Sequence, residues 1–343
     1  MTKPLFLQAF DKTNETVPVW FMRQAGRYLP EYQALKKNYA LEDMFKTPEL
    51  AAEITCQPVD ILGVDAAILF ADILTLPTAM GFNITFDNRK GPIIETCSSF
   101  DHVGNFTDLD YVARTIKMVN QRLSESVPLI GFAGGPFTVL TYLIEGGSST
   151  NFTKTFSFIH HQTDAFHKMM QKLTDNTIAY LLLQKQAGIK AFQLFDTWAG
   201  MLRPMDYAHW VLPYVKQVFK QVDLPSIYYV KNTHHLLSLM DQTDADFLSV
   251  DHTVVLGHHT IITKTKKGVQ GNLFNGLLYA DRKTLAREVN DVLVGGLKHD
   301  RFIFNLSHGV FPDIAVDQLK AVVKQVHSFN MAGARHGAPI QSV

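Results

Sequence analysis

The sequence predicts an α/β fold, a single domain of the (β/α)8 barrel type. Short apolar runs of strand length recur eight times, and stretches with helical spacing of apolar residues lie between them. Most of the runs are continuously apolar, as in parallel strands that are buried on both faces. We expect the barrel to occupy residues 1–330, with 331–343 as a flexible tail.

Each predicted strand ends at a polar or glycine residue. In chain order the strands are Val17–Met22, Ala66–Phe70, Pro128–Ala133, Ala191–Phe195, Pro225–Val230, Phe247–Val250, Gly268–Leu273 and Arg301–Leu306. The clearest helices are Thr163–Ala187, Thr284–Leu297 and Ile314–Phe329. The short connection between the sixth and seventh strands favours an irregular helix. A doubly wound sheet with an appended domain is the alternative, but it normally carries a glycine-rich dinucleotide turn, which this sequence lacks.

Composition limits the partners and the location of the protein. The 343 residues include 46% hydrophobic residues and equal numbers of basic and acidic residues, 32 each. There is no global field to attract nucleic acid or an anionic membrane, so an anionic ligand needs local positive charge. We find no signal-peptide pattern and no apolar run near the roughly 20 residues of a membrane-spanning helix, so we expect a cytoplasmic protein. Cys56 and Cys97 are too few for a disulfide framework and are expected to be reduced.

Polar residues follow the predicted strands, at the edge where barrel enzymes place their active sites. In strand order they are Arg23 and Arg27, Asp72, Gly134 and Gly135, Asp196 and Thr197, Lys231, Asp251 and His252, Asn272, and His308. Any one of them alone is better explained by a solvated loop or a helix cap than by a site. Their convergence on one rim indicates a site.

Arg23 and Arg27 form a candidate anion clamp. A tryptophan-led apolar strand precedes them, and a short Gln-Ala-Gly turn separates them. Guanidinium groups match carboxylates and phosphates, so the pair fits an anionic ligand. Two solvated surface charges are the alternative interpretation.

Three more residues are candidates for chemistry. Asp72 is a carboxylate within an apolar stretch, which fits acid–base or cation-stabilising work, or a helix N-cap. His308, beside a glycine at the end of the last strand, suits ligand binding or a satisfied core histidine. Tyr142 can point its phenol toward the rim or pack in the core. Histidines also occur in adjacent pairs, but adjacent helical residues diverge by about 100 degrees and no ligand motif accompanies them, so we predict no metal.

Four segments, in this order, resemble the uroporphyrinogen decarboxylase family. The most specific is Pro18–Tyr32, which reads Pro-Val-Trp-Phe-Met-Arg-Gln-Ala-Gly-Arg-Tyr-Leu-Pro-Glu-Tyr. The others are Asp65–Leu74, Gly134–Ser148 and Phe195–Gly200, and the resemblance runs from about Pro18 to Phe329.

The resemblance implies a (β/α)8 barrel that works as a homodimer without cofactor or metal. Its implied reaction is decarboxylation of the four acetate side chains of uroporphyrinogen III, which gives coproporphyrinogen III in porphyrin and heme biosynthesis. The substrate supplies its own electron sink, which accounts for the absence of cofactor signatures. The implied catalytic residues are Asp72, Arg23, Tyr142 and His308. The implied substrate-binding residues are Arg23, Gln24, Ala25, Gly26, Arg27, Asp72, Tyr142, Thr197 and His308.

The C-terminal half departs from the family pattern at four places that bear on rate, isomer preference and dimer strength. They are Lys231–His235, His252, Phe274–Asn275 and Ser307. Two rival functions remain to be weighed. A corrinoid- or zinc-dependent methyltransferase needs ligands near the late strand ends, but both cysteines fall before residue 100. A tetrapyrrole-binding protein without turnover would have no need of Asp72.

Overall fold

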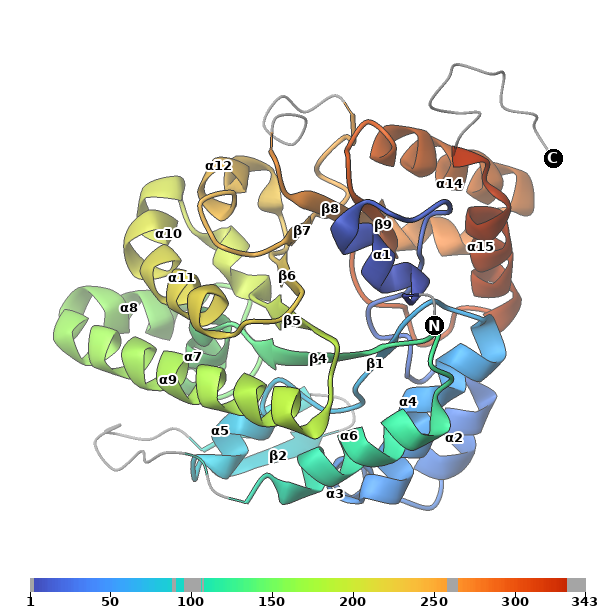
Figure 1. The fold of residues 1–343 in the computed structure, drawn as a ribbon. Coiled ribbons are helices and arrows are strands. Elements are labelled where there is room, and N and C mark those ends of the chain that lie inside the picture. The colour runs from blue at the N-terminus through green and yellow to red at the C-terminus, as the bar shows by residue number, and fades with distance from the viewer. Residues whose placement is uncertain (1–2, 88–90, 96–105, 107, 258–264, 332–343) are drawn as a thin grey trace.

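The computed structural model describes residues 3–87, 91–95, 106, 108–257 and 265–331. Seven parallel strands form one curled sheet in the order β1-β4-β5-β6-β7-β8-β9, and helices pack around its outside (Figure 1). The strands are β1 (Ala67–Ile68), β4 (Leu129–Gly134), β5 (Ala191–Phe195), β6 (Ser226–Tyr229), β7 (Phe247–Ser249), β8 (Gly268–Leu273) and β9 (Phe302–Leu306). A separate antiparallel hairpin, β2 (Ile84–Asp87) and β3 (Gly91–Ile94), follows β1 in the chain.

Helices connect the strands and account for most of the described chain. The α-helices are α1 (Leu5–Asp11), α2 (Pro30–Lys36), α3 (Leu41–Lys46), α4 (Pro48–Leu62), α5 (Thr75–Ala79), α6 (Asp110–Arg122), α7 (Pro136–Glu145), α8 (Thr153–His161), α9 (Thr163–Ala187), α10 (Pro204–Trp210), α11 (Leu212–Gln221), α12 (Leu237–Met240), α14 (Arg282–Gly296) and α15 (Val316–Ser328). Three 3-10 helices are η1 (Thr197–Met201), η2 (Thr233–His235) and η3 (Asn275–Tyr279). Among the described residues we find no helix with the length and apolarity that crossing a membrane requires.

Seven of the eight predicted strands are confirmed, each with bounds within three residues of the prediction. The predicted helix Thr163–Ala187 is confirmed with the same bounds as α9, and the last two predicted helices correspond to α14 and α15. The hairpin β2–β3 was not predicted. The irregular helix expected before β8 falls partly on residues 258–264, and the tail almost wholly on residues 332–343, both outside the described residues.

The described structure does not show a regular first strand at Val17–Met22, and so it does not show a closed eight-stranded barrel. Within this segment Val19 makes one isolated parallel bridge, to Phe304 of β9. Side chains take the place of ladder bonds on both sides of the segment. Asn305 Oδ1 accepts from Met22 N at 3.1 Å, and Asp65 Oδ2 accepts from Val19 N at 2.7 Å. Pro18, which has no N–H to donate, also interrupts regular pairing.

Buried polar side chains meet on the concave face of the sheet. Trp20 Nε1 donates to Gln270 Oε1 of β8 at 2.9 Å. Gln270 Nε2 donates to Gln193 Oε1 of β5 and to Ser249 Oγ of β7, both at 2.9 Å. Buried polar groups need such partners, because an unpaired one costs about 1–3 kcal/mol. The network therefore fixes the first segment against strands that are distant in the sequence.

Asp65 joins three parts of the fold at the amino-terminal edge of the sheet. Its Oδ2 accepts from Val19 N at 2.7 Å and from His327 Nε2 of α15 at 2.9 Å. The hydrogen bond to Asp65 raises the pKa of His327 above its ordinary value of 6.5, and burial opposes that effect. The protonated imidazolium is thus favoured in the folded protein.

Replacing His327 with Gln should reveal this ion pair as a pH-dependent contribution to stability. Because the folded pKa is raised, the contribution is fully present below pH 6.5 and is lost as the pH rises through the folded pKa. His327 is substantially exposed, so we expect at most about 1 kcal/mol. Urea unfolding of both proteins at pH 5.5 and pH 8.5 measures it. A difference of the same size at both pH values would contradict the assignment.

Candidate active site

The predicted site residues lie just beyond the carboxyl ends of the strands. Arg23 follows the first segment, Asp72 follows β1, and His308 follows β9. Tyr142 lies on α7, which follows β4, and Thr197 begins η1, which follows β5. The elements therefore bring these residues to one end of the sheet, as the sequence predicted.

Arg23 lies at the centre of this group. Its charge acts to lower the pKa values of four side chains from different parts of the fold, namely Asp72, Tyr142, Tyr229 and His308. A Cβ atom on Gly309 would come within 2.2 Å of Arg23 Cδ, so only glycine there lets the arginine side chain lie against the backbone after β9. The Arg23 backbone has φ 58, a left-handed conformation that is uncommon outside glycine.

Gln24 holds this turn in place. Its side chain is fully buried, accepts from Phe21 N at 3.0 Å and donates to Ala66 O at 3.0 Å. Its backbone carbonyl accepts from Tyr28 Oη at 2.7 Å. Gln24, predicted to bind substrate, thus has a side chain that is committed to the fold.

The rest of the predicted clamp lies farther along the turn. Ala25 and Gly26 are partly buried, and Arg27 is exposed. The charge of Arg27 acts to lower the pKa values of Tyr32 and Lys36 on α2. The two arginines therefore have different electrostatic neighbours.

Asp72 is a partly buried carboxylate directly after β1. Its Oδ1 accepts from Leu74 N at 2.8 Å, and its own N–H donates to Thr75 Oγ1 at 3.3 Å. Helix α5 begins three residues later and takes no side-chain cap, so the alternative role of Asp72 as its N-cap is not observed. Burial raises the pKa of Asp72, while the Leu74 hydrogen bond and the Arg23 charge oppose that rise.

His308 is partly buried and stacks on Tyr229 of β6. The ring planes are 8° from parallel with centroids 6.1 Å apart, and Tyr229 Oη lies 3.2 Å from His308 Nδ1. Burial, with help from the charges of Arg23 and Lys231, lowers the pKa of His308 to about 4. The imidazole is therefore neutral near pH 7 and can donate or accept a hydrogen bond.

Trp198 and Lys231 complete the rim. Lys231 was predicted to lie there without an assigned role, and Trp198 was not among the predicted site residues. The ring centroids of Trp198 and Tyr142 are 6.3 Å apart. Lys231 Nζ lies 6.0 Å from the centroid of the Trp198 ring. A Cβ atom on Gly200 would lie 1.6 Å from Lys231 O, so glycine is required where η1 meets this loop. In the sequence, Lys231 is recognisable as a basic residue that directly follows an apolar strand.

Asp196, fully buried after β5, anchors the helix that carries Tyr142. Its Oδ1 accepts from Thr138 N at 3.0 Å and from Thr138 Oγ1 at 2.7 Å. Its Oδ2 accepts from Tyr228 Oη at 3.2 Å. Burial raises the pKa of Asp196 to about 6, although these hydrogen bonds oppose the rise. The first turn of α7 is thereby fixed to β5 and β6.

The divergent positions also lie at this end of the sheet. The exposed rings of His252 and Phe274 are 4.5 Å apart between centroids. Ser307 is buried and donates to Asn275 Oδ1 at 3.3 Å. In the part of the chain that the structure describes, no group of three His, Cys, Asp or Glu residues is placed to hold a metal ion. The pair His258 and His259 lies outside the described residues.

Three cations at or near the rim lack an acidic partner. Arg23, Arg27 and Lys231 form no ion pair with any carboxylate of the described residues. Two of them, Arg23 and Lys231, act on the same buried histidine. Unpaired positive charge beside a desolvated surface favours an anionic ligand.

Comparison with known proteins identifies the family. A family model described as uroporphyrinogen decarboxylase (URO-D) matches residues 1–329. The chain is 45% identical to the uroporphyrinogen decarboxylase of Thermodesulfovibrio yellowstonii, over 95% of this chain and 98% of that protein. It is 39% identical to that of Carboxydothermus hydrogenoformans, over 95% and 96%. The chain belongs to the uroporphyrinogen decarboxylase family.

A solved structure supports the fold. A methyltransferase from Methanosarcina mazei superposes with a TM-score of 0.80 at 19% sequence identity, over 95% of this chain and 98% of that one. At this identity the likeness bears on the fold alone.

Replacing Asp196 with Ala should destabilise the protein by at least about 3 kcal/mol. The change leaves the Thr138 N–H, the Thr138 hydroxyl and the Tyr228 hydroxyl without their acceptor in a buried site. Tyr228→Phe, which removes one of these donors, is the control and should cost less. Denaturant unfolding measures both, and a larger loss in the Tyr228 variant would contradict the anchoring role.

Proposed function

We propose that this protein decarboxylates the four acetate side chains of uroporphyrinogen III to give coproporphyrinogen III and four molecules of CO2. The observation that carries the proposal is the cluster around Arg23, where unpaired cations and the partly buried carboxylate of Asp72 share one rim. Membership of the family supports it. No step of the proposed reaction needs a cofactor or metal.

The proposed fold is the (β/α)8 barrel, with Val17–Met22 as the eighth member of the ring. The segment bridges β9 at Val19, and Val19 O accepts from Asp65 N, just before β1, at 2.8 Å. Backbone hydrogen bonds on both sides support this assignment, although the ladder is not regular. A rim formed by all eight members suits a flat macrocycle.

The cations of the rim would bind the carboxylates of the substrate, which carries eight. Arg23 is best placed to orient the reacting pyrrole because its charge already acts on Asp72, Tyr142 and His308. Lys231 would bind a second carboxylate from the opposite side of the sheet, and Arg27 one farther out. Thr197, Ala25 and Gly26 would contact the substrate near these groups.

Asp72 would accept hydrogen bonds from pyrrole N–H groups and stabilise the positive charge of the protonated ring. Protonation of a ring carbon makes the ring an electron sink, the bond from the acetate CH2 to its carboxylate breaks, and CO2 leaves. The resulting enamine takes a proton at the exocyclic carbon, and the ring proton departs. A fixed carboxylate beside developing positive charge lowers the barrier most where water is excluded.

Tyr142 and His308 would complete the catalytic group as neutral partners. Burial raises the pKa of Tyr142, so its phenol stays protonated and can donate to a carboxylate. His308 is neutral as well, which leaves Arg23 and Lys231 as the charges that select an anionic substrate. A protonated histidine here would add a further positive charge beside Arg23 and Lys231.

The homodimer belongs to the proposal as well. Val255, Phe274 and Tyr279 are large, exposed apolar or aromatic residues that follow β7 and β8. They lie at the same end of the sheet as the catalytic group. A partner subunit on this face would cover them and enclose the substrate.

Replacing Asp72 with Asn should lower kcat at least 100-fold and change KM little, because the amide keeps the shape but not the charge. Anaerobic incubation with uroporphyrinogen III, followed by chromatography of the oxidised porphyrins, measures the seven- to four-carboxylate products. Asp175→Asn, on the exposed face of α9, is the matched control. Undiminished turnover by the Asp72 variant would refute its role, and tight binding without product by the wild type would indicate a non-catalytic tetrapyrrole-binding protein.

Replacing Lys231 with Met should raise KM about tenfold with a smaller effect on kcat. The loss of one carboxylate contact corresponds to about 1.4 kcal/mol of binding free energy. Lys216→Met, on the exposed side of α11, is the matched control. The same chromatographic assay gives both constants, and an unchanged KM would exclude Lys231 as a carboxylate ligand.

A further inference from the structure

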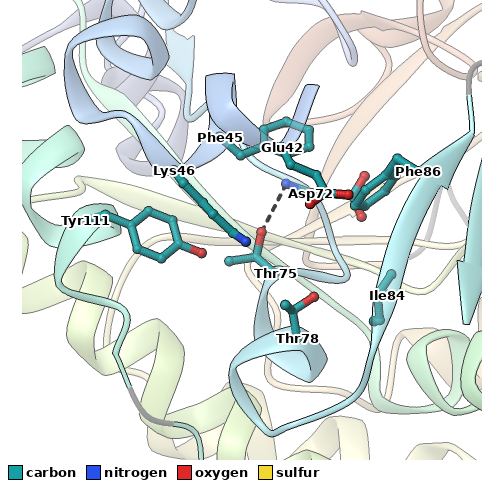
Figure 2. A pocket seen from close by; sticks show the side chains of 9 residues that line it. All are labelled: Glu42, Phe45, Lys46, Asp72, Thr75, Thr78, Ile84, Phe86 and Tyr111. Carbon is teal, nitrogen blue, oxygen red and sulfur yellow. Dashed lines mark hydrogen bonds between the residues drawn. The ribbon is translucent and has the colours of Figure 1, made fainter. Parts of the chain in front are cut away.

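A small recess of about 30 Å³ opens beside Asp72. Side chains of α3, α5, β2 and α6 line it, among them Lys46, Thr75, Thr78 and Tyr111 (Figure 2). These elements are different from those that carry Arg23, Tyr142 and His308. Asp72 belongs to both groups and so connects the recess with the catalytic cluster.

The recess has a mixed lining and has room for water. The apolar side chains are Phe45, Ile84 and Phe86, and the polar ones beside Asp72 are Glu42, Lys46, Thr75, Thr78 and Tyr111. A buried water occupies about 10–15 Å³ of such space, so the recess holds about two. Lys46 and Tyr111 point their polar ends toward Thr75, which accepts from Asp72 N (Figure 2). Lys46 is exposed at the mouth of the recess, while Thr75 is buried. A path for water therefore leads from solvent toward the carboxylate.

Asp72 has an oxygen available for such water. Its Oδ1 accepts from Leu74 N, and among the described residues its Oδ2 has no hydrogen-bond partner. The charges of Asp72 and Tyr111 both raise the pKa of Tyr180, so the three side chains lie within electrostatic range of one another. This oxygen is not among the buried side-chain atoms that lack a partner, so water or a ligand can reach it.

The reaction requires a supply of protons at this place. Each decarboxylation replaces a carboxylate on the acetate CH2 with a hydrogen, whereas the proton added to the ring is later released. One proton is thus consumed for each CO2, and four for each substrate molecule. A bound macrocycle covers the rim from which solvent would otherwise deliver them.

We propose that the recess is the proton entry route of the enzyme, with Lys46, Thr75 and Tyr111 positioning its water. A proton from bulk solvent passes along the recess water, each water regaining a proton as it gives one up, and protonates the Asp72 carboxylate. The Asp72 carboxyl transfers that proton to the substrate and returns to its ionised form. The electron pair of the broken C–C bond stays with the pyrrole–CH2 unit and forms the new C–H bond. This inference rests on the proposed decarboxylase function and adds a solvent route to it.

Filling the recess tests the route. Thr78→Leu adds apolar volume there. No acceptor is left unpaired, because Thr78 Oγ1 donates only to Leu74 O, which also accepts from Thr78 N. We expect kcat to fall at least tenfold, KM to stay within twofold, and the solvent deuterium isotope effect on kcat to rise as proton delivery becomes limiting. Thr85→Leu makes the same change at an exposed position on β2 and should behave as the wild type.

Tyr111→Phe provides an independent test if the Thr78 variant does not fold. It removes one hydroxyl from the recess and should lower kcat at least threefold, with an increased isotope effect and an unchanged KM. Wild-type kcat and isotope effect in the folded variants, or an equal loss in Thr85→Leu, would overturn the route. Absence of product from the wild-type protein would instead refute the proposed function.

Discussion

The attachment of the first segment to both of its neighbours is the constraint on which the rest of the site depends. Backbone bonds to Phe304 and Asp65 are sparse, and buried side chains supply the remainder, with Asn305 on one side and Gln24 on the other. Gln24 bonds both to Phe21 N and to Ala66 O, so one residue fixes the turn and ties it to the start of β1. The position of Arg23 follows directly, because its left-handed backbone is held between these bonds.

The electrostatics of the rim follow from that position. Arg23 and Lys231 lack carboxylate partners among the described residues, and their charges, together with burial, keep His308 neutral. Arg23 also opposes the rise in the pKa of Asp72 that burial causes. The site is therefore preorganised, with Arg23 and Lys231 placed to bind a polyanionic substrate and the Asp72 carboxylate placed beside the ring that becomes positively charged.

The sequence was most informative where one local pattern decides the structure. Short runs of strand length predicted β5 and β8 with their observed bounds, and helical spacing of apolar residues predicted α9. The first segment is apolar as expected, but it is not a regular strand, because side chains of Asp65 and Asn305, 46 and 283 residues away, replace the ladder. The same limit applies to the site. Residue type and strand position indicated Asp72 and His308, whereas the contact of Lys231 with Trp198 depends on how two loops pack.

Asp65 and Asp72 show how position decides the role of a residue. They flank the same two-residue strand, β1, at its opposite ends. At the amino-terminal edge, Asp65 Oδ2 binds both the Val19 N–H and His327, so its acceptor capacity is used for the fold. At the carboxyl edge, Asp72 uses one oxygen for Leu74 and keeps the other for water or ligand. Because sheets of this kind bind ligands at the carboxyl ends of their strands, a carboxylate left partly unsatisfied there can serve chemistry.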